Sequence, residues 1–160
     1  MQSPQRTDNV RIIKLVSDRS SLGVKRSEWE QPLSVAKPDP VVSIRHGEIS
    51  GGESSYRKHV AAIPQQVGCH YHAIGDEDYA VVEGQGILFF GRVIDGSVSL
   101  EEWKSIEVGV GDSFVIPEGY AHQLRKTGSE DLTILFGCPD AHLDDDKDRY
   151  LLPDAPLQIS

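Results

Sequence analysis

Short runs of β-forming residues, separated by glycine and proline turns, fill the centre of the chain. No segment sustains a helical period of about 3.6 residues. Turn signals such as Gly51-Gly52, Asp95-Gly96 and Gly111-Asp112 lie between the runs. Many short strands at regular spacing are typical of an all-β sandwich or barrel. The expected strands are 41–49, 55–63, 67–72, 78–83, 87–93, 106–108, 113–116, 122–126 and 132–136, with one short helical turn in 100–105.

The two ends of the chain depart from this pattern. Residues 10–16 are rich in β-formers and could add a strand at a subunit contact, and prolines at 32, 38 and 40 then break regular structure. The last part of the chain carries many aspartates and is expected to be a solvated terminal segment. The predicted organisation is an N-terminal extension over 1–40, a barrel over 41–139 and an acidic tail over 140–160.

Composition narrows the function classes. The 160 residues suit one domain, and 38% hydrophobic with 26% charged residues is an ordinary globular composition. A formal net charge of -9 argues against nucleic acid as a partner. Two cysteines make no disulfide framework and indicate a reducing compartment. No leader-like segment and no long apolar run are present, so we expect a cytoplasmic protein with no membrane partner.

The candidate chemistry lies in two histidine-bearing segments. On a strand, residues two apart share a face, so His70 and His72 project together. Glu77 follows a glycine-containing loop and begins the next strand, which could bring its carboxylate beside the two rings. In the second segment, a turn with Pro117 and Gly119 leads into His122. Three imidazoles and a carboxylate suit one divalent transition metal (Fe, Mn, Ni, Co or Zn) and are poor ligands for Ca or Mg.

These two segments resemble the two signature motifs of the cupin superfamily. The first motif, G-x5-H-x-H-x3,4-E-x6-G, is matched by His70, His72, Glu77 and Gly84, and Pro64 replaces its leading glycine. The second motif is G-x5-P-x-G-x2-H-x3-N. It is matched at Gly111, Pro117, Gly119 and His122, with Lys126 in place of the closing asparagine. The resemblance covers 41–136. It implies a double-stranded β-helix, a jelly-roll-like barrel, with His70, His72, Glu77 and His122 as metal ligands.

The resemblance also implies a range of activities. Four protein ligands leave two adjacent positions open on an octahedral metal, so substrate or substrate and O2 can bind there. The first expectation is a metal-dependent oxygenase, of the small dioxygenase kind, acting on a small oxygen-bearing metabolite. The alternatives are a non-redox isomerase, lyase or biosynthetic rearrangement enzyme, and a non-catalytic cupin that binds a small molecule. Cupins commonly form dimers, so a homodimer is expected.

Other residues are weaker candidates for the site. Tyr79 points inward with Glu77 if the strand is regular, as a proton donor, a substrate hydrogen bonder or a core residue. Arg57 and His59 share one strand face ahead of the metal-bearing strand and are candidate substrate-binding residues. His142, like His46, has no partner at ligand spacing and is expected to be a surface or hydrogen-bonded residue. Cys69 faces away from the candidate site by alternation and is expected to be a buried structural thiol.

Overall fold

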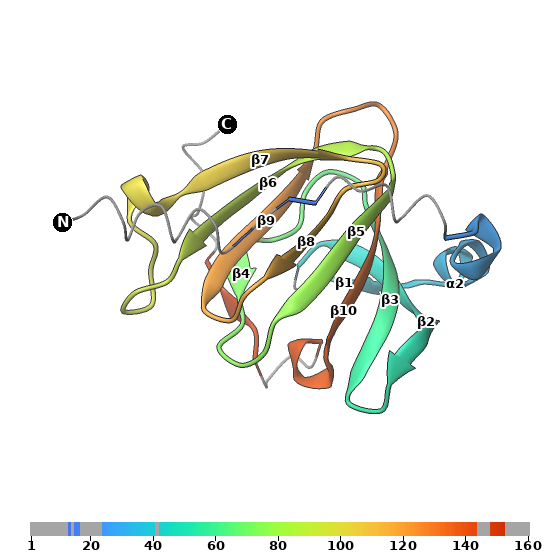
Figure 1. Ribbon diagram of the computed structural model, residues 1–160, viewed down its shortest axis with the longest axis horizontal. Helices are drawn as coiled ribbons and strands as arrows, with labels where there is room; N and C mark the ends of the chain where they lie inside the picture. The colour runs from blue at the N-terminus through green and yellow to red at the C-terminus, as the bar shows by residue number, and fades with distance from the viewer. Residues whose placement is uncertain (1–12, 14, 17–23, 41, 144–147, 153–160) are drawn as a thin grey trace.

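The structure is a computed structural model that describes residues 13, 15–16, 24–40, 42–143 and 148–152. Two antiparallel sheets face each other (Figure 1). One sheet has the order β1-β2-β3-β10-β5-β8 and the other has the order β11-β4-β9-β6-β7. The first sheet comprises β1 (Lys37–Asp39), β2 (Ile44–Glu53), β3 (Tyr56–Ile63), β10 (Leu132–Pro139), β5 (Glu77–Glu83) and β8 (Ser113–Ile116). The second comprises β11 (Tyr150–Leu151), β4 (His70–Tyr71), β9 (Tyr120–Lys126), β6 (Gln85–Arg92) and β7 (Lys104–Gly109).

The predicted all-β architecture is confirmed, and the differences are local. The expected strand over 67–72 is reduced to the two residues of β4, whereas the others keep their places with shifted ends. The short helical turn is present as η3 (Leu100–Glu102), and another, η4 (Asp140–His142), follows β10. A helix α2 (Glu30–Ser34), preceded by η2 (Arg26–Glu28), was not predicted. Pro32 lies in the first turn of α2, where a missing backbone N–H costs no hydrogen bond.

Side-chain alternation places the core between the two sheets. Five inward-facing positions on β5, β6 and β8 belong to the main buried cluster: Val81, Leu88, Phe90, Phe114 and Ile116. Phe89, next to Phe90 on β6, points to the other face of its sheet. There it packs with Cys69, Trp103 and Ala121 in a second, smaller cluster. The interior between the sheets is therefore available to side chains from both of them.

Described residues near both ends of the chain pair with strands of the two sheets. Val16 makes an isolated antiparallel bridge with Ser113 of β8, while most of the expected strand over 10–16 lies outside the described residues. At the other end, β11 pairs with β4, and Asp148 is buried. The expectation of a solvated terminal segment is therefore wrong for residues 148–152, because they extend a sheet by one strand. Figure 1 shows this segment beside β4.

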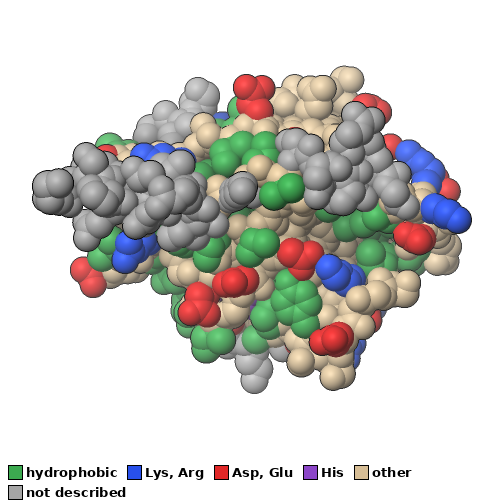
Figure 2. Space-filling model, in the orientation of Figure 1, with side chains coloured by type: hydrophobic (Ala, Val, Ile, Leu, Met, Phe, Trp, Pro, Cys, Tyr) green, Lys and Arg blue, Asp and Glu red, His purple; other side chains and the backbone are tan. Residues whose placement is uncertain are grey.

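The surface carries no single dominant feature on the face in view. Acidic side chains are spread over that face in separate places, with hydrophobic side chains between them (Figure 2). Of the helices in the described ranges, none has the length and apolar character needed to cross a membrane.

Candidate metal centre

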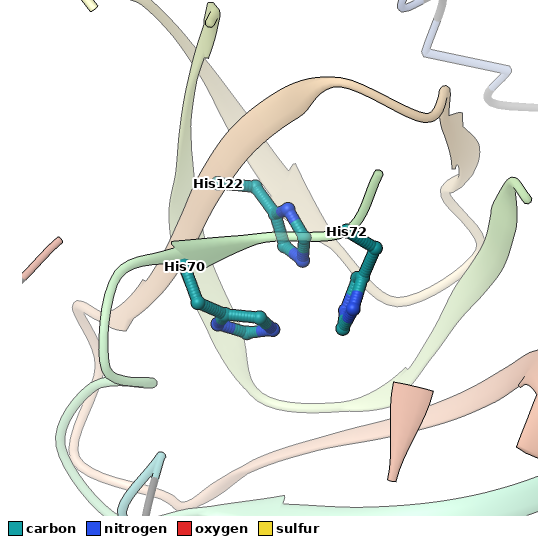
Figure 3. Close-up of side chains that lie close together, drawn as sticks. All are labelled: His70, His72 and His122. Atoms are coloured by element: carbon teal, nitrogen blue, oxygen red, sulfur yellow. The ribbon is translucent and has the colours of Figure 1, made fainter. Parts of the chain in front are cut away.

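Strand pairing brings the three motif histidines together. His70 on β4 lies directly opposite His122 on β9, and their ring centroids are 4.5 Å apart. His72 lies just beyond β4, where its carbonyl oxygen accepts a hydrogen bond from Gly119 N at 2.7 Å. The three rings point toward one another (Figure 3). One nitrogen from each of the three lies within 4.8 Å of the others, so they could hold one metal ion.

Backbone carbonyl groups fix the orientation of each ring. Nδ1 of His70 donates to the carbonyl oxygen of Gly68 at 2.7 Å, and Nδ1 of His122 donates to that of Tyr120 at 3.1 Å. Nδ1 of His72 donates to the carbonyl oxygen of Asp148 at 2.5 Å. A carbonyl oxygen can only accept, so each Nδ1 carries a hydrogen and each neutral ring keeps a lone pair on Nε2. A hydrogen bond of this kind from the other ring nitrogen orients histidine ligands on metals.

Glu77 reaches the histidines from the opposite sheet. It lies on β5 across from Ile116, and its side chain is buried. Its Oε2 is 3.3 Å from Nε2 of His72, and its Oε1 is 3.3 Å from Nε2 of His122. With neutral rings, lone pairs face each other across both gaps, and Nε2 of His72 makes no hydrogen bond. A cation between them removes this conflict.

The donor set and its spacing fit a divalent transition metal. Two ligands about 2.1 Å from one ion lie about 3.0 Å apart in octahedral geometry and about 3.4 Å apart in tetrahedral geometry. The 3.3 Å separations between Glu77 and the two imidazoles agree with either arrangement. His70, His72, Glu77 and His122 are therefore the residues that could hold the ion, as expected from the sequence.

Burial and mutual contacts shift the pKa values of this cluster. Burial acts to raise the pKa of Glu77, but His72, His122 and His142 hold it well below the usual range. Burial and the neighbouring His122 and His72 lower the pKa of His70 well below its ordinary value. The cluster therefore favours an ionised carboxylate and a neutral His70, which are the protonation states that metal ligation requires.

Tyr79 lies in the site, as alternation along β5 predicted. Its hydroxyl donates a hydrogen bond of 2.6 Å to Oε1 of Glu77 and lies 3.4 Å from Nε2 of His122. Its ring stacks on Phe114 at 5.2 Å. Burial and the Glu77 carboxylate raise the pKa of Tyr79 well above its ordinary value, so the phenol stays protonated.

A small, mostly apolar cavity opens beside these groups. The volume open to the centres of water molecules is about 30 Å³, which is room for two or three waters. Its polar lining comprises the four candidate ligands with Tyr79, His142 and Arg149. Its apolar lining includes Val42, Ile44, Val67, Leu124, Ile134 and Phe136.

Sequence reasoning missed His142 as a member of the site. Its ring stacks on that of His72 at 3.7 Å, its Nδ1 lies 3.0 Å from Oε2 of Glu77, and its Nε2 lies 2.7 Å from the carbonyl oxygen of Ile74. Although burial acts in the other direction, the Glu77 carboxylate and Ile74 raise the pKa of His142. No short-range sequence pattern predicts this contact, because His142 and Glu77 lie 65 positions apart in the sequence.

Residues 148–152 were also missed, and they support His72. Besides the main-chain contact to His72, the Asp148 carboxylate accepts hydrogen bonds from the backbone N–H of Ala73 at 2.7 Å and Ile74 at 3.0 Å. The adjacent Arg149 lines the cavity and donates from a terminal guanidinium nitrogen to Oδ2 of Asp39 at 2.7 Å. The aspartate-rich composition of this stretch predicts neither the support of His72 by Asp148 nor the position of Arg149 in the cavity wall.

The two substrate-binding candidates on β3 do not line the cavity. Arg57 is half exposed and pairs with Glu48 at 3.4 Å and Asp140 at 3.6 Å. His59 is buried and stacks at 5.0 Å on Phe136, which does line the cavity. Cys69 is a buried free thiol on the outer face of its sheet, as expected, and burial raises its pKa to about 12.

Comparisons with known proteins rest on structure alone. Neither a protein-family profile nor a curated protein sequence matches the chain. Solved structures do match it. The capsular polysaccharide assembling protein CapF from Staphylococcus aureus is 22% identical with a TM-score of 0.57, and the match covers 68% of this chain and 30% of that one.

Two enzymes with other printed activities match to a similar extent. Oxalate decarboxylase from Lactobacillus farciminis is 16% identical with a TM-score of 0.54, over 74% of this chain and 34% of that one. L-ribose isomerase from Cellulomonas parahominis is 13% identical with a TM-score of 0.52, over 68% of each chain. The chain thus spans about a third of the length of CapF and the decarboxylase.

These neighbours are cupin-fold proteins, and the chain shares that fold, an antiparallel double-stranded β-helix. The histidine and glutamate cluster within it is a possible metal site of the kind that this fold supports. No activity follows from the likeness, because one fold hosts many functions.

Proposed function

We propose that the protein binds one divalent transition metal through His70, His72, Glu77 and His122 and uses it to transform a small oxygen-bearing metabolite. The observation that carries the proposal is the pair of 3.3 Å gaps between Glu77 oxygens and imidazole Nε2 atoms. Each ring donates from Nδ1 to a carbonyl oxygen, so neutral rings leave no hydrogen for either gap. A bound cation resolves both conflicts at once.

When bound, the metal would supply Lewis acidity or redox chemistry to an oxygen-containing substrate. The surrounding residues have their own parts. The apolar wall limits water in the cavity. Tyr79 keeps its proton and donates it to the Glu77 carboxylate. Each ring nitrogen of His142 faces an oxygen acceptor, Glu77 Oε2 at Nδ1 and the Ile74 carbonyl oxygen at Nε2. Phenol and imidazole thus place transferable protons at the edge of the cavity.

Oxygenase chemistry is the first candidate activity, because a small, mostly apolar cavity suits a reaction that must limit water. Isomerase, lyase or rearrangement chemistry is the second candidate. The hydrogen-bonded Tyr79 and His142 favour it, because such reactions move protons between substrate atoms. A non-catalytic cupin that binds a small molecule is the third. The expected homodimer and the cytoplasmic location stay predictions, and light scattering on the full chain tests the first.

Elemental analysis tests the metal centre directly. Protein purified without chelator or nickel resin is expected to contain close to one transition metal ion per chain, and His72→Ala is expected to lose it. His46→Ala is the matched control, since that imidazole is hydrogen-bonded to Asp39 and does not line the cavity. Iron would direct the next assay to O2 consumption, whereas zinc, manganese or nickel would direct it to isomerisation or lyase activity. Equal metal content in wild type and His72→Ala would refute the assignment.

A further inference from the structure

One charged side chain in the cavity has no part in the proposed metal centre. The Arg149 side chain is 2% exposed and lines the same cavity as the candidate ligands. Strand pairing explains its direction. Tyr150 lies opposite Tyr71 and Leu151 lies opposite His70, and the two tyrosine rings stack at 5.0 Å. Arg149, one residue before Tyr150, therefore shares the inner face of the sheet with the histidines.

The guanidinium group of Arg149 is buried at the cavity wall, and Asp39 holds it there. A buried ion pair is seldom more stable than apolar residues of the same volume. Asp39, which accepts from Arg149 at 2.7 Å, also lies 3.1 Å from Nε2 of His46, so its carboxylate is shared. A guanidinium carries five N–H donors arranged in a planar fork. A charged fork in the wall of a small, mostly apolar cavity is the kind of group that orients a ligand.

We propose that Arg149 binds the carboxylate of the molecule that this site acts on, so that the substrate class is small organic carboxylates. The inference rests on the proposed function, because the other oxygens of the ligand would reach the metal. The ligand would then contact a positive group at each end, the metal at one and Arg149 at the other. Arg149 lies in residues 148–152, which follow the barrel and lie outside both histidine motifs.

Two features favour a carboxylate over a phosphate. Among the described residues that line the cavity, Arg149 is the one lysine or arginine, and a planar carboxylate matches a single guanidinium fork. A phosphoryl group carries more charge and usually gathers several cations or backbone N–H groups. The room for two or three waters also favours a ligand of few heavy atoms.

The competing explanation is that the ion pair of Arg149 with Asp39 only stabilises the fold by joining the two sheets. Asp39 lies on β1 and Arg149 precedes β11, and these are edge strands of the two different sheets. A clamp of this kind would be broken equally by changing either partner. A ligand-binding role, in contrast, needs the guanidinium and not the aspartate. Asp39→Asn retains an oxygen acceptor for Arg149 and removes a negative charge, so it should bind an anion as well as wild type or better.

The experiment follows ligand binding to the cobalt-loaded full chain through its visible absorption spectrum. The probes are glycolate and pyruvate, with their neutral amides as controls of matched size. The proteins are wild type, Arg149→Gln, Arg149→Lys and Asp39→Asn, each first checked for cobalt content and for folding by circular dichroism. Arg149→Gln is expected to weaken carboxylate binding about 10- to 100-fold and leave amide binding unchanged, as loss of charged hydrogen bonds implies. Arg149→Lys should fall between.

Each outcome has a distinct meaning. If wild type takes up cobalt but carboxylates bind no better than their amides, or bind Arg149→Gln as tightly as wild type, the inference is overturned and the metal centre stands. Equal losses in Arg149→Gln and Asp39→Asn would show a clamp and also overturn it. If wild type takes up no cobalt, the proposed function fails and the inference falls with it. Should Arg149→Gln not fold, the comparison of wild type, Arg149→Lys and Asp39→Asn decides in the same way.

Discussion

Removing the Asp148 carboxylate should destabilise the protein by an amount that follows from its contacts. The side chain accepts two hydrogen bonds, from Ala73 N at 2.7 Å and from Ile74 N at 3.0 Å. Hydrogen bonds to a carboxylate are stronger than neutral ones, but Ala73 and Ile74 are exposed enough for water to replace it. We therefore expect Asp148→Ala to cost about 1 to 1.5 kcal/mol per bond, or about 2 to 3 kcal/mol in total.

Thermal unfolding of the metal-free protein, followed by circular dichroism, measures this loss. For a chain of this size the expected change corresponds to a melting temperature lower by about 4 to 12 °C. Asp148→Asn keeps one acceptor oxygen and should lose about half as much. Asp140→Ala is the matched control from the same acidic stretch. Its carboxylate is half exposed and lies 3.6 Å from the half-exposed Arg57, so the change should stay within about 0.5 kcal/mol.

A second readout connects Asp148 to the metal centre. Its carbonyl oxygen holds Nδ1 of His72, so loosening the segment should also reduce metal affinity, by about tenfold as for other changes behind a metal ligand. Competition with a chromogenic chelator measures that affinity. An Asp148→Ala protein that melts within about 1 °C of wild type and retains its metal affinity would refute the reasoning, because docking of residues 148–152 would then contribute nothing measurable.

Two further predictions concern neighbouring side chains. Burial, assisted by His46, lowers the pKa of His59 to about 4, against about 6.5 in an unfolded chain, so the unfolded state binds the proton first. This contribution to stability should fall as pH drops below about 6.5, by about 2 kcal/mol at pH 5. Denaturant titrations should therefore give His59→Gln a flatter pH profile than wild type, and parallel profiles would contradict this. Tyr79→Phe retains the stacking on Phe114 but loses the 2.6 Å bond to Glu77. It should cost about 1 kcal/mol in the same titrations with metal content unchanged, and metal loss would place Tyr79 among the groups that hold the ion.

The parts of the site that sequence reasoning reached are those set by local geometry. Alternation along one short strand pointed His70 and His72 the same way, and it also placed Tyr79 beside Glu77. The glycines and proline before His122 marked the turn that begins β9. These rules need only a few consecutive residues. The same alternation accounts for the interior positions of β5, β6 and β8 that lie in the core.

The missed residues reach the site across long separations in sequence. His142 contacts Glu77 over 65 positions, Asp148 contacts His72 over 76, and Arg149 contacts Asp39 over 110. No periodicity links such pairs, and an aspartate-rich stretch favours a solvated segment when considered alone. The short helix α2 was missed for a different reason. Pro32 was treated as a break, whereas proline is well tolerated in the first helical turn.

The position of residues 148–152 has a thermodynamic consequence for the metal centre. His72 presents Nε2 to the cluster because its Nδ1 is hydrogen-bonded to the Asp148 carbonyl oxygen, so the docked segment favours the tautomer that binds metal. Linkage is reciprocal, and a metal on Nε2 must favour docking of the segment by the same free energy. Arg149 lies in that segment, and its guanidinium enters the cavity only when the segment is docked. Metal binding and completion of the cavity wall would therefore be coupled equilibria, although His72 and Asp148 lie 76 positions apart in the sequence.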